Sequence, residues 1–419
     1  MSDKISYSCH GDIAILTVQN PPVNALSQPV RQGLWDGMDR AEAEQGIRAI
    51  MIVGEGRAFF AGADITEFGK PPLKPHLPDL INRIESSPLL IVASMHGVSL
   101  GGGLEVALGC HYRIAVPTAC VGLPEVHLGL LPGAGGTQRL PRLAGVIAAL
   151  ELMTTGRHVD AEEGHKLGII DKIQDGDPKL NGIAYTQKLL DQNTPRRPVS
   201  DMPAPEKINW DEAFEKALKS GRGQISPAWC VRAVQASVEK PFEEGLEAER
   251  QIFFDLMQTE QRQGMIHAFF SQRAVSNLPE LKGITPRPLK NIALIGGGTM
   301  GAGIATSALL SGLKVTVLEM NKHATQAAFD RIENNLSGAK KRGKIDSQQY
   351  ENIVNHSLKL VTDYGKLSDM DLVIEAVFEE MAVKKRVFEE LDRVCKPGAI
   401  LASNTSYLDI NEIAASTSR

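Results

Sequence analysis

The chain has 419 residues, of which 42% are hydrophobic, and a formal net charge of −5. This length exceeds one ordinary domain and the apolar content suffices for at least two cores, so we expect two or three domains. Because charges of both signs are interspersed and form no basic stripe, the sequence argues against nucleic acid as a partner.

Cysteine usage and the N-terminus indicate the compartment. The five cysteines are scattered, odd in number and without CxxC or Cys/His ligand spacing, which favours a reducing compartment and no metal site. The N-terminal segment MSDKISYSCHGD lacks the basic start and apolar core of a signal peptide, so we expect a protein that is not secreted. The most apolar stretch begins at Leu89, but His96 and Glu105 interrupt it before it reaches the length of a membrane span.

The first part of the chain alternates strand-like and helical patterns. Strands are predicted at 12–18, 48–53 and 89–93, and helices at 28–43 and 136–153. Such alternation predicts an α/β domain with crossover connections.

Two Pro-containing segments interrupt the later patterns, one at 194–207 and one ending near 290. Between them, long helical patterns at 210–221 and 227–270 are typical of packing helices. We therefore divide the chain into an α/β domain, a helical linker domain and a nucleotide-binding domain, at residues 1–193, 194–280 and 281–419.

The segment IGGGTMGAGIA follows an apolar strand and opens a helix. Gly296, Gly298 and Gly301 stand in GxGxxG spacing, and the next strand ends in Glu319. The glycines would permit a tight turn, close approach of a pyrophosphate and close helix packing, while the helix N-terminus faces the phosphates. Glu319 would bind the ribose hydroxyls and repel a 2′-phosphate, which favours NAD over NADP. The alternative is a vestigial nucleotide fold in which the glycines form a packing turn.

A second glycine triplet, in SLGGGLEVALGC, precedes Glu105 in the first turn of a helical pattern. By itself this is an ordinary helix start with a carboxylate at the positive end of the dipole. Another carboxylate follows at Glu125, and the turn FFAGADI upstream offers a further backbone N–H. Together these features suggest acid/base chemistry beside an oxyanion site, although spacing alone does not bring the two carboxylates together.

Several segments resemble known families. NPPVNALS, FFAGADI, SLGGGLEVALGC and VGLPEVHLGLLPGAGGTQRLPRLAG resemble the enoyl-CoA hydratase/isomerase (crotonase) family. IGGGTMGAGIA, DLVIEAVFEE and LASNTSYL resemble the NAD-binding domain of 3-hydroxyacyl-CoA dehydrogenases. This order is that of multifunctional enzymes of fatty-acid β-oxidation of the peroxisomal type. The resemblance implies an α/β chain with an N-terminal crotonase (ββα spiral) domain, a helical linker and a doubly wound Rossmann-type domain.

For the first domain the resemblance implies hydration of a trans-2-enoyl-CoA thioester without a cofactor. The N–H groups of Ala61 and Gly102 would hold the thioester oxygen, Glu105 would take a proton from the water that attacks C3, and Glu125 would deliver one to C2. The family also supports Δ3,Δ2 isomerisation with Glu125 as the proton shuttle. Another crotonase-type thioester reaction, such as hydrolysis or decarboxylation, is the alternative. The expected lining of the CoA-thioester pocket is Ala61, Gly62, Ala63 and Asp64.

For the last domain the resemblance implies NAD contacts, with Ser406 also touching the substrate hydroxyl. The family's catalytic histidine follows this serine, whereas the last histidine of this chain is His356 and the chain ends at Arg419. We therefore expect a truncated dehydrogenase domain that does not oxidise its substrate, or an acyl-CoA- and NAD-binding fragment without turnover. The implied NAD contacts are Gly296, Gly298, Met300, Gly301, Glu319, Val377, Phe378, Glu379, Lys384 and Ser406.

Partners and location follow from the same resemblance. Acyl-CoA substrates are expected, with no metal, no nucleic acid and no membrane span. The oligomeric state stays open, a monomer being what the peroxisomal type implies. The expected location is the cytoplasm for a bacterial source and the peroxisome for a eukaryotic one.

Overall fold

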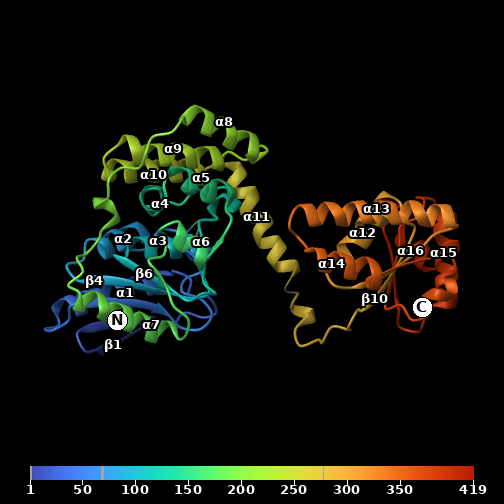
Figure 1. Cartoon of the computed structure of the whole chain (residues 1–419), viewed down its shortest axis with the longest axis horizontal. Helices are drawn as coiled ribbons and strands as arrows, with labels where there is room; N and C mark the ends of the chain where they lie inside the picture. The colour runs from blue at the N-terminus through green and yellow to red at the C-terminus, as the bar shows by residue number, and fades with distance from the viewer. Residues whose placement is uncertain (1, 68–69, 277) are drawn as a thin grey trace. The chain divides into compact units, whose positions relative to one another are not determined.

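The computed structural model describes residues 2–67, 70–276 and 278–419. The chain divides into two compact units, residues 1–280 and 281–419 (Figure 1). Among the described residues, no helix combines the length and apolarity needed to cross a bilayer.

The first unit is built on a six-stranded sheet in the order β1-β2-β3-β4-β6-β9. Strands β1 and β2 form an antiparallel hairpin and the other neighbours pair in parallel. The strand predictions at 12–18, 48–53 and 89–93 are confirmed by β2, β3 and β4. These three strands are buried along their whole length, as is typical of apolar strands within a parallel sheet. The strands are β1 Ile5–His10, β2 Ile13–Val18, β3 Ala49–Gly54, β4 Leu90–Met95, β6 Tyr112–Ala115 and β9 Lys172–Ile173.

A small second sheet, β5-β7-β8, contains the strand that directly precedes the first glycine triplet. Its strands are β5 Val98–Leu100, β7 Cys120–Gly122 and β8 Val159–Asp160. The helices around the two sheets are α1 Gln28–Ala43, α2 Leu77–Glu85, α3 Gly102–Gly109, α4 Gly136–Ala144, α5 Val146–Thr155, α6 Ala161–Lys166 and α7 Pro178–Asp191.

The two helices predicted for the first part of the chain differ in outcome. The helix predicted at 28–43 is confirmed as α1, whereas the single helix predicted at 136–153 is wrong. Gly145 adopts φ +79°, a conformation that L side chains avoid, and it ends α4 and starts α5.

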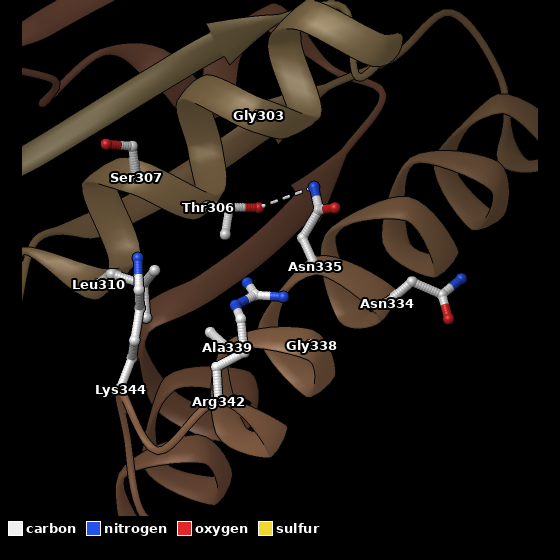
Figure 2. Close-up of a pocket in the computed structure, with 10 residues that line it drawn as sticks. All are labelled: Gly303, Thr306, Ser307, Leu310, Asn334, Asn335, Gly338, Ala339, Arg342 and Lys344. Atoms are coloured by element: carbon white, nitrogen blue, oxygen red, sulfur yellow. Dashed lines mark hydrogen bonds between the residues drawn. The ribbon is translucent and has the colours of Figure 1, made fainter. Parts of the chain in front are cut away.

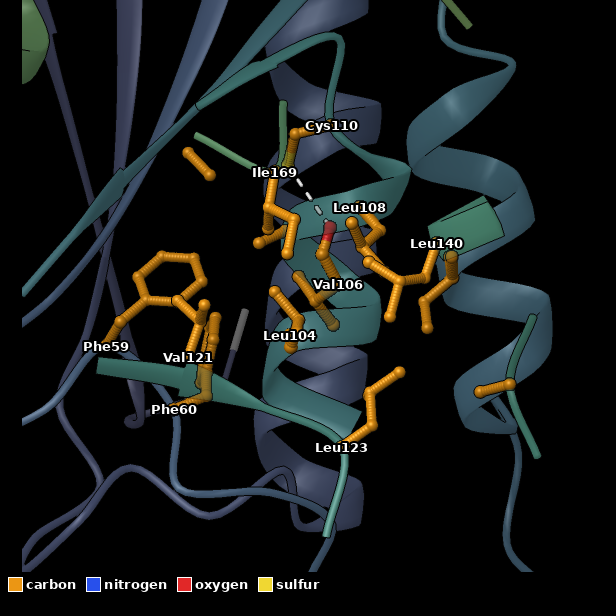
Figure 3. Packing of buried hydrophobic residues seen from close by; sticks show 14 of the residues in the cluster. Phe59, Phe60, Leu104, Val106, Leu108, Cys110, Val121, Leu123, Leu140 and Ile169 are labelled. Carbon is orange, nitrogen blue, oxygen red and sulfur yellow. Dashed lines mark hydrogen bonds between the residues drawn. The ribbon is translucent and has the colours of Figure 1, made fainter. Parts of the chain in front are cut away.

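Helix α3 is buried along its whole length. Apolar side chains enclose it, as Figure 3 shows for Phe59, Val121, Leu123, Leu140 and Ile169. Burying a side chain of this size contributes roughly 1.5–3 kcal/mol. The helix that begins at the glycine triplet is therefore fixed in place by the main core of the unit.

The helical region after residue 209 belongs to the same unit. Helix α9 contributes Cys230, Val231 and Val234 to the core that surrounds α3. The helical pattern at 227–270 is divided after Glu239 and Met257, where Pro241 and Thr259 act as N-caps of the next helices. The four helices are α8 Trp210–Gly221, α9 Ser226–Glu239, α10 Phe242–Met257 and α11 Glu260–Val275.

The second unit has a five-stranded parallel sheet in the order β12-β11-β10-β13-β14. The chain starts in the central strand, moves outward on one side and then on the other, which confirms the doubly wound nucleotide-binding fold. Its strands are β10 Asn291–Ile295, β11 Lys314–Leu318, β12 Leu358–Val361, β13 Leu372–Glu375 and β14 Ile400–Ser403. Its helices are α12 Thr299–Leu310, α13 Lys322–Lys341, α14 Ser347–Asn352, α15 Met381–Val394 and α16 Ile410–Ala414.

A buried ion pair joins α4 to α2 in the first unit. The Arg139 guanidinium is fully buried and donates to Glu85 Oε2 at 2.6 Å and to Asn82 Oδ1 at 2.9 Å. Glu85 also accepts the Ser200 N–H at 3.0 Å. Because each charge is buried, removing one partner leaves the other without compensation.

We therefore expect Arg139→Met to lower the free energy of unfolding by about 3–5 kcal/mol. Denaturant titration followed by tryptophan fluorescence reports on this unit, because Trp35, Trp210 and Trp229 all lie in it. The exposed Arg40→Met is the control and should cost under about 1 kcal/mol. If the loss of unfolding free energy in the Arg139→Met/Glu85→Leu double variant equals the sum of the losses in the two single variants, the two charges do not depend on each other.

Candidate active site

Each glycine of the first triplet meets a different neighbour. Gly101 adopts φ +53°, and a side chain on Gly103 would lie 2.3 Å from the Phe60 carbonyl oxygen. A side chain on Gly102 would lie 3.3 Å from the Ala63 nitrogen. The triplet therefore lets the start of α3 approach the turn after Phe60 with backbone against backbone.

Glu105 lies one turn into α3 and is 3% exposed. Its Oε1 accepts the N–H groups of Ala134 and Gly136, both at 2.8 Å. Burial raises the pKa of Glu105, while these two N–H groups and the charge of Arg139 act in the opposite direction. The two N–H groups and Arg139 thus offset part of the cost of burying the anionic form.

Glu125 begins the short 3₁₀ helix Glu125–Leu128 and faces the same region. A side chain on Gly101 would lie 2.9 Å from Glu125 Oε1. Glu125 Oε2 is buried and has no hydrogen-bond partner among the described residues. Burial, followed by the charge of Glu105, raises the pKa of Glu125 well above its usual value. The structure therefore brings the two carboxyl groups together, one suited to be a base and the other to hold a proton.

The structure contradicts the role expected for Ala61. Its N–H donates to the Val23 carbonyl at 3.1 Å, so it is not available to a ligand. The amide next to Gly102 is that of Ala63 instead. The sequence Ala61-Gly62-Ala63 does not indicate which of its three backbone N–H groups faces the start of α3. The direction of these groups depends on the φ of +117° at Gly62.

Asp64 closes the same turn. Its Oδ1 accepts both the N–H of Thr66 at 3.0 Å and the Thr66 hydroxyl at 2.7 Å. This carboxylate shapes the backbone that carries Ala63, a local role typical of aspartate in turns.

A third buried carboxyl group was not predicted from the sequence. Glu249 of α10 is 1% exposed, and its Oε1 accepts the Gly135 N–H at 2.6 Å. Its Oε2 accepts the Thr137 N–H at 3.0 Å and the Thr137 hydroxyl at 2.5 Å. Glu249 shares the buried face of α10 with Gly245 and Leu256. An acidic residue at helical spacing from residues of a buried face was the available signal in the sequence, because acidic side chains are seldom fully buried.

In the second unit the glycine turn has the geometry of a phosphate-binding loop. Gly296 adopts φ +91°, and a side chain on Gly301 would lie 1.9 Å from the Gly296 carbonyl oxygen. Gly298 caps α12, and a side chain there would meet no atom within 4 Å among the described residues. The open space lies where the unpaired N–H groups of a helix N-terminus attract anions.

Glu319 follows β11 and lies beside this turn. Its Oε1 accepts the Gly297 N–H at 2.6 Å. The predicted acidic partner and the glycine turn are therefore neighbours in the fold.

Lys384, expected to contact the cofactor, is enclosed by protein. Its ammonium is 1% exposed and donates to Glu375 Oε1 at 2.7 Å and pairs with Glu379 Oε2 at 3.1 Å. Glu375 Oε1 also accepts the Val377 N–H at 2.7 Å. The structure therefore gives Lys384 the task of fixing the segment after β13, because its donors are already directed at carboxylates.

The remaining predicted residues of this unit divide into a network and an open surface. Glu379 accepts the Thr405 hydroxyl and the Ser406 N–H, which together lower the pKa of Glu379 to about 2. Met300 and Phe378 are 61% and 79% exposed. Apolar side chains so exposed are available to cover a ligand.

A cavity of about 370 Å³ lies elsewhere in this unit, between α12 and α13. Its lining is polar, and Asn335 donates to the Thr306 hydroxyl at 3.3 Å (Figure 2). None of the predicted site residues lines it. In the part of the chain that the structure describes, no cluster of three or more His, Cys, Asp or Glu side chains could hold a metal ion.

Comparison with known proteins assigns the two regions. Residues 9–193 match the enoyl-CoA hydratase/isomerase family, and residues 291–419 match the NAD binding domain of 3-hydroxyacyl-CoA dehydrogenase. These matches confirm the crotonase-type domain at the N-terminal end and the NAD-binding domain after the helical region.

Curated relatives match nearly the whole chain. The peroxisomal bifunctional enzymes of Homo sapiens and Danio rerio are 41% and 42% identical over 98% and 97% of this chain, which is 58% and 57% of their own length. The peroxisomal fatty acid beta-oxidation multifunctional protein of Arabidopsis thaliana is 36% identical over 97% of this chain and 58% of its own length. The chain thus spans less than two thirds of the relatives that it matches. The chain is similar to these bifunctional enzymes over both matched regions, in which an enoyl-CoA hydratase/isomerase region precedes the NAD binding domain of a 3-hydroxyacyl-CoA dehydrogenase.

Proposed function

We propose that the first unit hydrates trans-2-enoyl-CoA to 3-hydroxyacyl-CoA and also isomerises Δ3-enoyl-CoA to Δ2-enoyl-CoA. The observation that supports this most directly is the pair of buried carboxyl groups with opposite surroundings. Glu105 is held by two N–H groups, and Glu125 has a buried oxygen without a partner among the described residues. Two titratable groups whose surroundings push their pKa values apart are suited to act as base and acid.

The hydration follows from this arrangement. The thioester oxygen would lie between the N–H groups of Ala63 and Gly102, where negative charge develops as C3 is attacked. Glu105 accepts a proton from the attacking water, whose oxygen bonds to C3, and Glu125 gives its proton to C2. Addition of one water thus leaves Glu105 protonated and Glu125 ionised, and proton exchange with solvent restores both.

Isomerisation uses the same acid without the water. Glu125 in its ionised form removes a proton from C2, and the negative charge that develops on the thioester oxygen is stabilised by the two N–H groups. Return of the proton to C4 moves the double bond into conjugation. Glu105 has no covalent task in this sequence.

For the second unit we propose that NAD binds at the glycine turn with its pyrophosphate at the start of α12. When bound, NAD supplies an acceptor for the hydride of a 3-hydroxyacyl-CoA. Glu319 would accept hydrogen bonds from the ribose and disfavour a 2′-phosphate, while Ser406 would orient the substrate hydroxyl. Glu379 and Lys384 would keep that serine in place through the network described above.

For the whole protein we propose acyl-CoA thioesters of fatty-acid β-oxidation as substrates. The relatives are named as peroxisomal enzymes. We infer a peroxisomal location for a eukaryotic source and a cytoplasmic one for a bacterial source, with the monomer as the working oligomeric state.

Substitution of the two glutamates separates the reactions. With crotonyl-CoA, Glu105→Gln and Glu125→Gln should each lower kcat about 10²–10⁴-fold, because one proton transfer is lost. With a 3-enoyl-CoA, Glu125→Gln should lose isomerisation, whereas Glu105→Gln should retain most of it. The absorbance of the conjugated thioester follows both reactions. The exposed Glu162→Gln serves as the control, and full hydratase activity in both variants would refute the assignment.

The pH dependence follows from the two raised pKa values. Hydration requires Glu105 ionised, so kcat/KM should rise as the pH passes the pKa of Glu105. It requires Glu125 protonated, so kcat/KM should fall as the pH passes the higher pKa of Glu125. We expect a bell-shaped profile whose alkaline limb disappears from the residual activity of Glu125→Gln. A wild-type profile that keeps rising into the alkaline range would contradict the acid role of Glu125.

Glu319 should determine the choice of dinucleotide. Glu319→Ala should weaken NAD binding about 10–100-fold, because charged hydrogen bonds to the ribose are lost. Glu319→Gln should weaken NAD binding less but improve NADP binding, because only the negative charge is removed. Isothermal titration calorimetry measures both, with the exposed Glu351→Gln as the control. An unchanged NAD-to-NADP ratio in Glu319→Gln would exclude a role of its charge.

A further inference from the structure

The loop between Gly133 and Thr137 lies between two buried carboxyl groups. The N–H groups of Ala134 and Gly136 donate to Glu105, and those of Gly135 and Thr137 donate to Glu249. Four successive amides thus alternate between two acceptors on different helices. The donors on Glu105 cannot be displaced without moving those on Glu249.

Helix α10 also holds this loop by packing. Arg250 Nη1 donates to the Gly133 carbonyl at 3.3 Å, and a side chain on Gly133 would lie 2.4 Å from the Phe253 ring. A side chain on Gly135 would lie 3.2 Å from Leu246. The loop is therefore fitted closely against the same helix that carries Glu249.

The charges around Glu249 come from several elements. Arg250 neighbours it on α10, Glu105 faces it from α3, Glu125 from the 3₁₀ helix and the Cys230 thiol from α9. Burial, and then the charge of Glu105, raises the pKa of Glu249 to about 8. The hydrogen bonds that Thr137 and Gly135 donate to Glu249 act in the opposite direction.

We propose that Glu249 is a positioning residue of the hydratase site, which fixes the 133–137 loop so that two amides orient the Glu105 carboxylate. The inference rests on the proposed hydratase function. It also explains why a carboxyl group is buried here, since an apolar side chain would leave the Gly135 and Thr137 N–H groups unsatisfied.

The isosteric Glu249→Gln tests this directly. Its amide oxygen can still accept the Gly135 N–H, but its NH₂ group faces the Thr137 N–H and repels it. The amides on Glu105 should then lose alignment, which raises the pKa of Glu105. We expect kcat for crotonyl-CoA to fall about 10–100-fold with KM within about twofold, and the acidic limb of the pH profile to move up by about one unit.

Matched variants separate positioning from stability. Glu247→Gln lies on the exposed side of the same helix and should leave kcat and the pH profile unchanged. Thr137→Val removes the hydroxyl donor to Glu249 but keeps the loop N–H groups, so its effect should be smaller and in the same direction. Tryptophan fluorescence during thermal unfolding checks that each variant is folded at the assay temperature. If Glu249→Gln does not fold, Thr137→Val carries the test.

The readouts distinguish failure of this inference from failure of the proposed function. Wild-type kcat and an unmoved acidic limb in Glu249→Gln, together with an inactive Glu105→Gln, would overturn the positioning role alone. A wild-type chain that does not hydrate crotonyl-CoA would overturn both. An infrared pH titration of the carboxylate band that Glu105→Gln lacks measures the pKa of Glu105 without turnover, and an unchanged value in Glu249→Gln would likewise refute the proposal.

Discussion

The first unit depends on how the protein accommodates negative charge in its interior. Glu105 is buried on a helix whose every residue is buried, where an isolated carboxylate would be strongly disfavoured. Two backbone N–H groups offset this cost, and they can reach the carboxylate because Gly136 has no side chain: one would lie 2.8 Å from Glu105 Oε1. Burial, and then the charge of Glu105, raises the pKa of Glu125. The contrasting surroundings of the two carboxyl groups are therefore products of one arrangement.

The two glycine triplets show how the same letters serve different physical tasks. In the first unit, Gly102 and Gly103 let a helix start approach a neighbouring turn with backbone against backbone. In the second, Gly296 and Gly301 allow a tight strand-to-helix turn, and the open space lies beyond Gly298. The context of each triplet, an acidic residue in the helix in one case and an acidic strand end in the other, distinguished them from the sequence alone.

Much of the architecture could be predicted because it depends on local patterns. Strand-like apolar segments identified β2, β3 and β4, and the strand, glycine turn and Glu319 identified the nucleotide-binding fold. The sequence failed where backbone direction or tertiary contact decides. The break at Gly145 depends on a positive φ, and the choice of Ala63 over Ala61 depends on which amide already has a partner.

The site residues followed the same division. Glu105 and Glu125 were predicted because the resemblance supplied their roles, but only the fold brings them together. Lys384 was predicted as a ligand contact, and its enclosure by two acidic side chains could not be inferred from spacing along the chain. Glu249 was overlooked because a single acidic residue in a charged helical pattern is usually on the solvent side.

The attachment of α10 to the catalytic loop has a consequence for the modularity of the chain. The region that matches the hydratase family ends at residue 193, yet Glu249 and Arg250 lie more than fifty residues beyond it, and α9 fills part of the same core. Recombination or engineering that joined a foreign partner directly after residue 193 would remove half of the support of that loop. The part of the chain that holds the 133–137 loop extends at least through α10, so helices beyond the family match are also part of the first unit.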